Sequence, residues 1–236
     1  MWSIKDIKKK GRSALKKNYW RSVVAAALMF FLTAVASMLS RNRSESILKN
    51  VGFEPLHKMT PDELIIIAGI VAVGYMAILV SAVLVKIIFS NALEAGGCLF
   101  FKSNVEKESA ELTLLREGFS DYAHVFVTLL LRDVYVALWL CLGVFPGIVK
   151  IYSYRMVPYI VKDYPDLSEL EVITLSRKMM DGNKWRAFLM DLTFGGWLIA
   201  GFVTFGAVNV LWTIPYYENT KAALYLELNG EQDLIK

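Results

Sequence analysis

The chain is strongly apolar for its size. Its 236 residues are 56% apolar and 20% charged, with a mean hydropathy of +0.43, whereas about a quarter of the residues in soluble domains are charged. Because it has 2 Cys, 6 Pro and 15 Gly without a short period, the composition excludes a disulfide framework, a collagen-like repeat and a disordered chain. It predicts an all-α, polytopic membrane protein with a single membrane domain over residues 1–236.

Positive charge is concentrated at the N-terminus. The net charge of +4 is too small to indicate nucleic-acid binding, but basic residues cluster before the first apolar segment. Such a cluster marks the cytoplasmic side of a membrane protein and attracts anionic lipids. We therefore expect residues 1–19 to form a basic amphipathic helix on the cytoplasmic face. The absence of a small-x-small cleavage site favours an anchor over a cleaved signal peptide.

Two apolar segments, 22–39 and 64–85, are each close to the roughly 20 residues that a helix needs to cross a bilayer. Thr60-Pro61-Asp62-Glu63 gives the second segment a capping box and a proline in its first turn. These features predict a first hairpin over residues 20–90, followed by a cytoplasmic segment over 91–121.

Two further hairpins are expected downstream. Pro146-Gly147 is the one clear breaker within residues 122–163, so it predicts the turn of the second hairpin. The third hairpin covers residues 186–228 and turns around 205–209, with a tail over 229–236. This gives about six spans in three hairpins. Four spans are the alternative, which would place residues 162–186 outside the cell.

An imperfect repeat relates two parts of the chain. At a constant offset of 165, residues 12–21 and 177–186 share Arg, Asn, Trp and Arg, and each copy precedes an apolar segment. A looser third copy precedes Tyr122. Because Trp and Arg anchor helices at the level of lipid headgroups, the repeat predicts interfacial anchors. They are Trp20, Arg21, Trp185 and Arg186.

The segment 164–185 is predicted to be an interfacial helix. Ser168-Glu169-Leu170-Glu171 forms a capping box, and apolar side chains follow at helical spacing. Its basic residues favour the cytoplasmic side.

Charged residues inside apolar segments are candidates for function, because each costs about 3 kcal/mol or more in a bilayer. Our hypothesis pairs Asp133 or Asp191 with Arg155 in a polar site near aromatic residues. The candidate intramembrane polar site consists of Asp133, Arg155, Asp191, Tyr152 and Tyr154. The alternative is that these charges are structural. Arg132 and Asp133 are adjacent and are expected on different helix faces, so they should not neutralise each other.

Other groups favour no chemistry. Glu218 and Lys221 predict a local ion pair. His57 and His124 have no ligand at metal spacing, and Cys98 and Cys141 are expected to be buried thiols. The sequence carries no catalytic or nucleotide-binding motif, so we expect no enzyme activity, metal or cofactor.

The chain resembles a bacterial membrane family known as domain of unknown function 975. The resemblance rests on motifs distributed over most of the chain, namely Ala14-Leu15-Lys16, Asn18-Tyr19-Trp20, Gly96 to Phe101, Pro146-Gly147, Tyr152-Ser153-Tyr154, Pro158-Tyr159, Asp163, Ser176-Arg177, Met180, Gly182-Asn183-Lys184, Trp197 and Pro215-Tyr216. Its layout is similar to the membrane domain of some glycerophosphodiester phosphodiesterases, without their catalytic domain. The resemblance implies a multi-pass protein of a bacterial plasma membrane and transfers no catalytic residue, while the basic cluster predicts a cytoplasmic N-terminus.

These observations lead to two functional expectations. The first is a non-catalytic scaffold, accessory subunit or lipid-interacting factor whose partners are the lipid bilayer, anionic lipids, and a protein partner or further copies of the chain. The alternative is a carrier or export component for a small or lipid-like solute. No nucleic-acid partner is expected.

Overall fold

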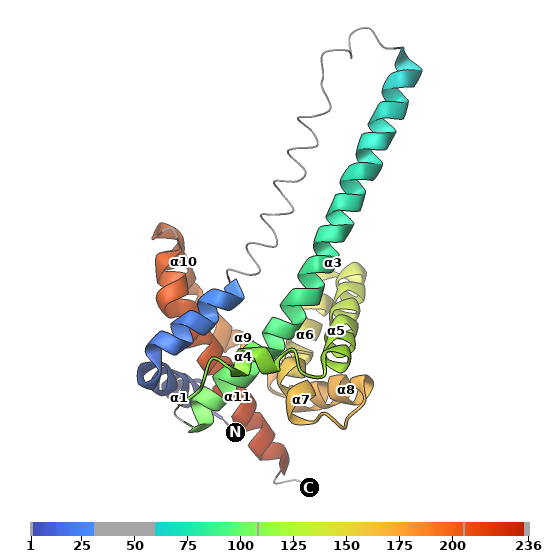
Figure 1. Ribbon diagram of the computed structural model, residues 1–236. Coiled ribbons are helices and arrows are strands. Elements are labelled where there is room, and N and C mark those ends of the chain that lie inside the picture. The colour runs from blue at the N-terminus through green and yellow to red at the C-terminus, as the bar shows by residue number, and fades with distance from the viewer. Residues whose placement is uncertain (1, 31–59, 108, 205, 234–236) are drawn as a thin grey trace. The chain divides into compact units, whose positions relative to one another are not determined.

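The computed structural model describes residues 2–30, 60–107, 109–204 and 206–233, and every regular element in these ranges is a helix (Figure 1). The all-α class is therefore confirmed. The elements are α1 (Ile4–Lys17), a helix over Tyr19–Phe30, α3 (Pro61–Lys107), α4 (Leu114–Glu117), α5 (Tyr122–Leu142), α6 (Val144–Ser153), α7 (Val157–Asp163), α8 (Glu169–Met179), α9 (Lys184–Leu192), α10 (Gly195–Val203), the π-helix η2 (Asn209–Thr213) and α11 (Ile214–Asp233).

The internal contacts of the chain divide it into two compact units, and the single membrane domain expected over residues 1–236 stays a prediction. One consists of residues 1–30 and 91–236, and the other of residues 31–90, because each set contacts mainly itself. The end of the first predicted span and its outer loop fall on 31–59, outside the described residues. The predicted boundary at 90/91 lies inside α3, which continues to Lys107, because Asn91 to Phe101 is rich in small and apolar residues that extend the helix.

The first unit is built around the packing of α1 against α11. α1 buries Ile7, Gly11 and Leu15 along one stripe and leaves its basic residues outside. A Cβ at Gly11 would lie 2.6 Å from Thr220 Oγ1, so this close approach requires glycine. Further into the core, the Tyr159 and Tyr225 rings stack with centroids 4.7 Å apart. The same core includes Phe100, Phe101, Leu129, Met156, Ile160, Met180 and Met190.

The second hairpin turns at a different residue from the one predicted. α5 ends at Leu142 and α6 begins at Val144, so the turn residue is Gly143, at φ 156°. Pro146 lies in the first turn of α6, where its missing N–H removes no helical hydrogen bond. The expectation of a turn at Pro146-Gly147 is therefore wrong, because both residues lie inside α6.

The second arm of this hairpin is not one continuous helix. α6 has 10 residues, which make it about 15 Å long, and the chain bends over Tyr154–Met156 before α7 begins. Pro158 fits the first turn of α7 and thereby favours a new helix start. Arg155, expected near the middle of a span, lies in this bend. Among the described residues, only α5 is long and apolar enough to cross a membrane.

The third hairpin is formed by α10, η2 and α11. The chain reverses between α10 and η2, where Gly206 adopts a φ of 87° that favours glycine. Phe205, in the predicted turn, lies outside the described residues. α10 has nine residues and is about 14 Å long.

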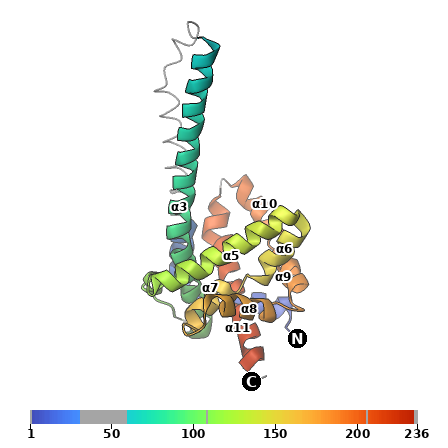
Figure 2. The ribbon, with the colours of Figure 1, turned by 90° about the vertical axis from the view of Figure 1, so that its right-hand side faces the viewer.

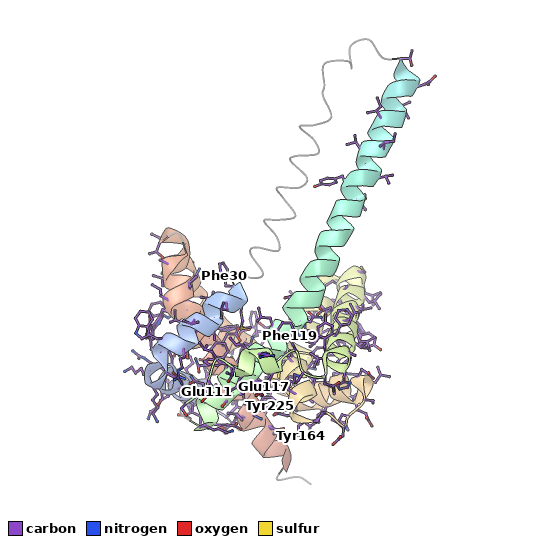
Figure 3. The ribbon with its side chains drawn as sticks, in the orientation of Figure 1. Phe30, Glu111, Glu117, Phe119, Tyr164 and Tyr225 are labelled. Atoms are coloured by element: carbon purple, nitrogen blue, oxygen red, sulfur yellow. The ribbon has the colours of Figure 1, made fainter. Side chains whose placement is uncertain are left out.

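Within the first unit, the apolar hairpins lie at one end. The other end is formed by α7, α8 and the end of α11, which we call the charged helices. Figures 1 and 2 both show α10 and the α5–α6 tip extending in one direction, with α7, α8 and the end of α11 lying in the other. Side chains project outward along the hairpins (Figure 3). The large apolar side chains that are exposed there include Leu138, Leu142, Val144, Phe145, Ile148, Ile151, Trp197, Ile199, Val203 and Leu211.

Candidate functional site

A polar cavity of about 340 Å³ lies among α3, α5, α6, α9 and α11 in the first unit. All five residues of the candidate site predicted from the sequence line it. Its lining residues are Glu94, Arg132, Asp133, Val136, Ile151, Tyr152, Tyr154, Arg155, Asp191, Tyr217 and Lys221.

One group of charges is organised around Arg155, whose side chain is only 9% exposed. Its two terminal nitrogens donate to the two oxygens of Asp191, each at 2.9 Å. Nη2 also donates to Tyr217 Oη at 3.0 Å, and Tyr152 Oη donates to Asp191 at 2.9 Å. The bend between α6 and α7 thus aims a guanidinium at a carboxylate of α9 in the fork geometry that makes such pairs strong. Of the two partners hypothesised for Arg155, Asp133 and Asp191, the structure pairs it with Asp191.

A second group is organised around Arg132 of α5. Its terminal nitrogens donate to the two oxygens of Glu94, at 2.8 and 3.0 Å. Its Nε donates to Asp133 Oδ1 at 2.9 Å. Burial acts to raise the pKa of Glu94, but Arg132 outweighs it and holds this pKa below 4.5. Glu94 therefore remains ionised at neutral pH.

This second group corrects one expectation. Arg132 and Asp133 do form an ion pair, because the long Arg132 side chain curls back along α5 to reach its neighbour. The rule that adjacent helical residues face apart describes their Cβ directions and not the reach of a guanidinium. Asp133 consequently pairs with Arg132, and the hypothesis that it pairs with Arg155 finds no such contact.

Lys221 completes the lining. Its Nζ donates to Glu218 Oε1 at 3.0 Å on the same face of α11, as the spacing of three residues predicts. The cavity is thus lined by three cations and three carboxylates, and each of the three cations is ion-paired. Such mutual neutralisation lowers the cost of charge in an apolar setting.

Sequence reasoning missed Glu94, Tyr217 and Lys221 as members of this site. The signal for Glu94 is a lone acid in the run Asn91-Ala92-Leu93-Glu94-Ala95-Gly96-Gly97, which is otherwise small or apolar. A search for membrane spans does not include that run, because the predicted span 64–85 ends before Lys86.

The predicted interfacial anchors divide into two roles. Trp20 and Trp185 are 71% and 68% exposed. The adjacent arginines instead bind backbone carbonyls, with Arg21 donating to Ala110 at 3.2 Å and Arg186 to Trp2 at 2.7 Å. At both repeat copies the Trp side chain is exposed and the adjacent Arg donates to a backbone carbonyl.

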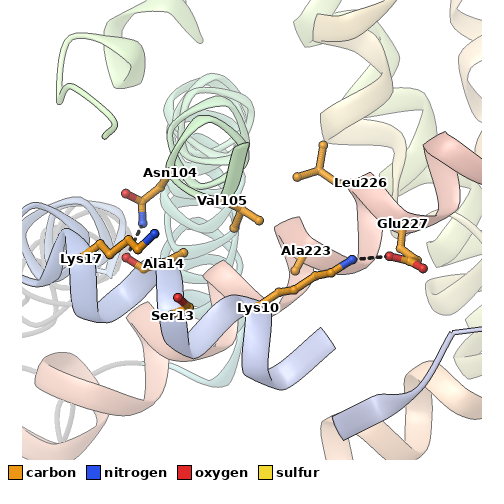
Figure 4. Close-up of a pocket in the computed structure, with 9 residues that line it drawn as sticks. All are labelled: Lys10, Ser13, Ala14, Lys17, Asn104, Val105, Ala223, Leu226 and Glu227. Carbon is orange, nitrogen blue, oxygen red and sulfur yellow. Dashed lines mark hydrogen bonds and ion pairs between the residues drawn. The ribbon is translucent and has the colours of Figure 1, made fainter. Parts of the chain in front are cut away.

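A second cavity, of about 360 Å³, lies between α1, α3 and α11 (Figure 4). Lys10 and Glu227 form an ion pair at its rim. At its inner end, buried Asn104 donates to Ala14 O at 3.2 Å and to Asn219 Oδ1 at 2.7 Å. These bonds tie three elements together and give this cavity a structural role.

The described part of the chain also bears on the expectations for metal ligands and thiols. It contains no group of three or more His, Cys, Asp or Glu side chains placed to hold a metal ion. Burial raises the pKa of the Cys98 thiol, which favours the unreactive protonated form. Cys141 is exposed, contrary to expectation, because the end of α5 carries its side chain outward. His57 lies outside the described residues.

Together, the helices and the neutralised cavity define an all-α protein with apolar hairpins around a polar cavity. Residues 144–232, from the start of α6 to the end of α11, match the family described as "Protein of unknown function (DUF975)". The resemblance noted in the sequence is therefore confirmed over this part of the chain. No curated protein and no solved structure matches the chain.

Proposed function

We propose that this protein is a non-catalytic integral membrane protein of the bacterial plasma membrane that interacts with lipid and serves as a scaffold or accessory subunit. The observation that carries the proposal is the gathering of exposed apolar side chains on the tips of two hairpins at one end of the first unit. Large apolar side chains that gather on an exposed surface mark membrane or protein contacts.

The lengths of the helices support insertion of these tips into the bilayer. α6 is about 15 Å long and α10 about 14 Å, roughly half of a hydrocarbon core of about 30 Å. α5 is long enough to cross, but its first half packs Val125 and Leu129 into the core of the unit. The proposal therefore places both tips in the leaflet nearer to the charged helices.

A contact between distant residues supports a common side for the N-terminus and α8. Trp2 Nε1 donates to Asn183 Oδ1 at 2.8 Å, immediately before α9, and Arg186 donates to Trp2 O. Groups in direct contact lie on the same side of a membrane. This contact favours the six-span arrangement, or its equivalent with shallow hairpins, over the four-span alternative that separates them.

The proposal is tested by fractionation and by depth measurement. The protein should stay with membranes after washing at high pH and be released by detergent. A bimane label on cysteine at Phe145 or Val203 should be quenched by acyl-chain quenchers. The same label at Asp181, on the charged side, should be quenched by aqueous iodide. Release by alkaline washing, or aqueous quenching at both tips, would contradict the proposal.

A carrier for a small solute is a second candidate, and the polar cavity favours it because its charges face one another around open volume. Replacing Asp133, whose side chain is 40% exposed, with Asn separates the two functions. The structural role predicts a normally folded, fully active protein at normal membrane levels. Loss of a solute-dependent growth phenotype at normal levels would favour the carrier.

A further inference from the structure

Two adjoining cavities at the base of the α5–α6 hairpin differ from the polar cavity in their charge. The first, which we call the basic cavity, has a volume of about 320 Å³. It is lined by Lys150, Ser153, Thr174, Arg177, Lys178, Asp181 and Lys184. Four cations thus face one carboxylate, whereas positive and negative groups are balanced in the polar cavity.

The single acid does little to neutralise this charge. Asp181 is 84% exposed and its Oδ1 lies 3.7 Å from Lys184 Nζ, so it is solvated and distant. This contact between Asp181 and Lys184 is the ion pair that the described residues form in the basic cavity. Lys150 has its Nζ 4.3 Å from the centroid of the Trp139 ring, an attraction that leaves its charge in place. The basic cavity is therefore suited to an anion.

The second cavity, which we call the apolar cavity, has a volume of about 300 Å³ and shares Lys150, Thr174 and Arg177 with the first. Its remaining lining consists of Tyr135, Trp139, Tyr154, Leu170 and Ile173. It continues toward the hairpin whose exposed side chains include Leu138 and Ile151. The basic cavity and the apolar cavity thus adjoin each other through shared lining residues.

We propose that the two cavities together bind one anionic phospholipid, a deepening that rests on the membrane role proposed above. The phosphate lies in the basic cavity, where Arg177 and Lys150 supply charge-assisted donors and the Thr174 hydroxyl a further one. The acyl chain lies along Trp139, Leu170 and Ile173. A soluble phosphate ester would use only the basic cavity, so the apolar cavity assigns the ligand to lipid.

The test uses the full chain, purified in detergent and stripped of lipid, with native mass spectrometry as the readout. Phosphatidylglycerol should bind with a stoichiometry of one and at least tenfold more tightly than phosphatidylcholine. The double variant Arg177→Gln/Lys178→Gln, at two exposed positions, should lose at least tenfold in phosphatidylglycerol affinity. The matched variant Lys107→Gln/Arg116→Gln removes equal charge from two exposed positions outside both cavities and outside the N-terminal basic cluster and should change it less than twofold.

A second variant separates lipid from free phosphate. Leu170→Gln, at a side chain that is 56% exposed, should weaken phosphatidylglycerol at least threefold without changing the unfolding temperature. Glycerol 1-phosphate should bind at least a hundredfold more weakly than the lipid. Equal affinities for phosphatidylglycerol and glycerol 1-phosphate would overturn the lipid assignment. Equal losses of phosphatidylglycerol affinity in the two double variants would overturn the site. Neither result touches the membrane role, which fails if alkaline washing releases the protein or if the labels at both tips are quenched from water.

Discussion

At the scale of single residues, the Arg155–Asp191 pair decides how charge is tolerated in this fold. The guanidinium is nearly buried and serves two acceptors, so removing either partner leaves an uncompensated charge in a poorly solvated place. Removing one member of such a pair costs about 3–5 kcal/mol, whereas replacing both with apolar groups is often neutral.

We therefore predict strong coupling between these two positions. Arg155→Met and Asp191→Leu should each destabilise the protein by about 3 kcal/mol, and the double variant should be more stable than the sum of the single effects by about 1–3 kcal/mol. Chemical unfolding in detergent, followed by circular dichroism, measures all four corners of the cycle. Additive losses would show that the pair acts as two independent contacts.

The same residues show what sequence reasoning can and cannot reach. Charges within apolar segments identified Asp133, Arg155 and Asp191 as a set, because a bilayer penalises them all, and the structure places all three around one cavity. The partner of each could not be predicted, since pairing depends on the bend between α6 and α7. Glu94 was missed because its helix continues beyond the predicted end of the membrane segment.

At the scale of helices, α8 depends on its first turn. Glu171 Oε2 accepts from both the backbone N–H and the hydroxyl of Ser168, at 2.9 and 2.7 Å, and these bonds hold the pKa of Glu171 below its usual 4.5. A carboxyl group with a lowered folded pKa stabilises the fold above its unfolded pKa. That contribution is lost as the pH falls through the folded value.

We predict that the start of α8 loosens in acid. Hydrogen exchange of its first amides, corrected for intrinsic rates, should accelerate as the pH falls from 4.5 through the lower folded pKa. In Glu171→Gln, which cannot titrate, these amides should be less protected at neutral pH, with little further change in acid. The same acid response in both proteins would mean that Glu171 is not its cause.

The packing of α1 on α11 offers a second prediction at this scale. Gly11→Leu should destabilise the protein by about 1–3 kcal/mol, because its side chain would overlap the backbone of Thr220. Exchange of the α1 amides should rise selectively. Ser13→Leu, at an exposed position of the same helix, is the matched control and should leave that exchange unchanged.

The turns that connect helices were predicted less well than the caps that begin them. The capping box at Ser168 forms as expected because it depends only on residues three apart. The turn of the second hairpin lies at Gly143, which can adopt a backbone conformation that other residues avoid, while Pro146 fits within the first turn of α6. A cap between residues three apart can be predicted from the sequence. Which of two nearby helix-breaking residues forms the turn depends on packing.

At the scale of the whole molecule, the contact of Trp2 with Asn183 constrains topology. We predict that single cysteines at Ser3, Ser168 and Asp181, in a Cys-free background, resist an impermeant maleimide in whole cells. All three should react in inverted vesicles. Labelling of Ser168 and Asp181 but not Ser3 in whole cells would restore the four-span alternative.

The seating of α1 on α11 also affects the order of assembly. α1 is synthesised before α11, yet α11 covers Ile7 and Leu15 and is separated from α1 by more than 190 residues. For a protein with the proposed membrane role, the membrane surface is the apolar partner that this amphipathic helix has while it waits for α11. We therefore expect the completion of α11 to transfer α1 from lipid to protein, so that a later helix fixes the position of an earlier one.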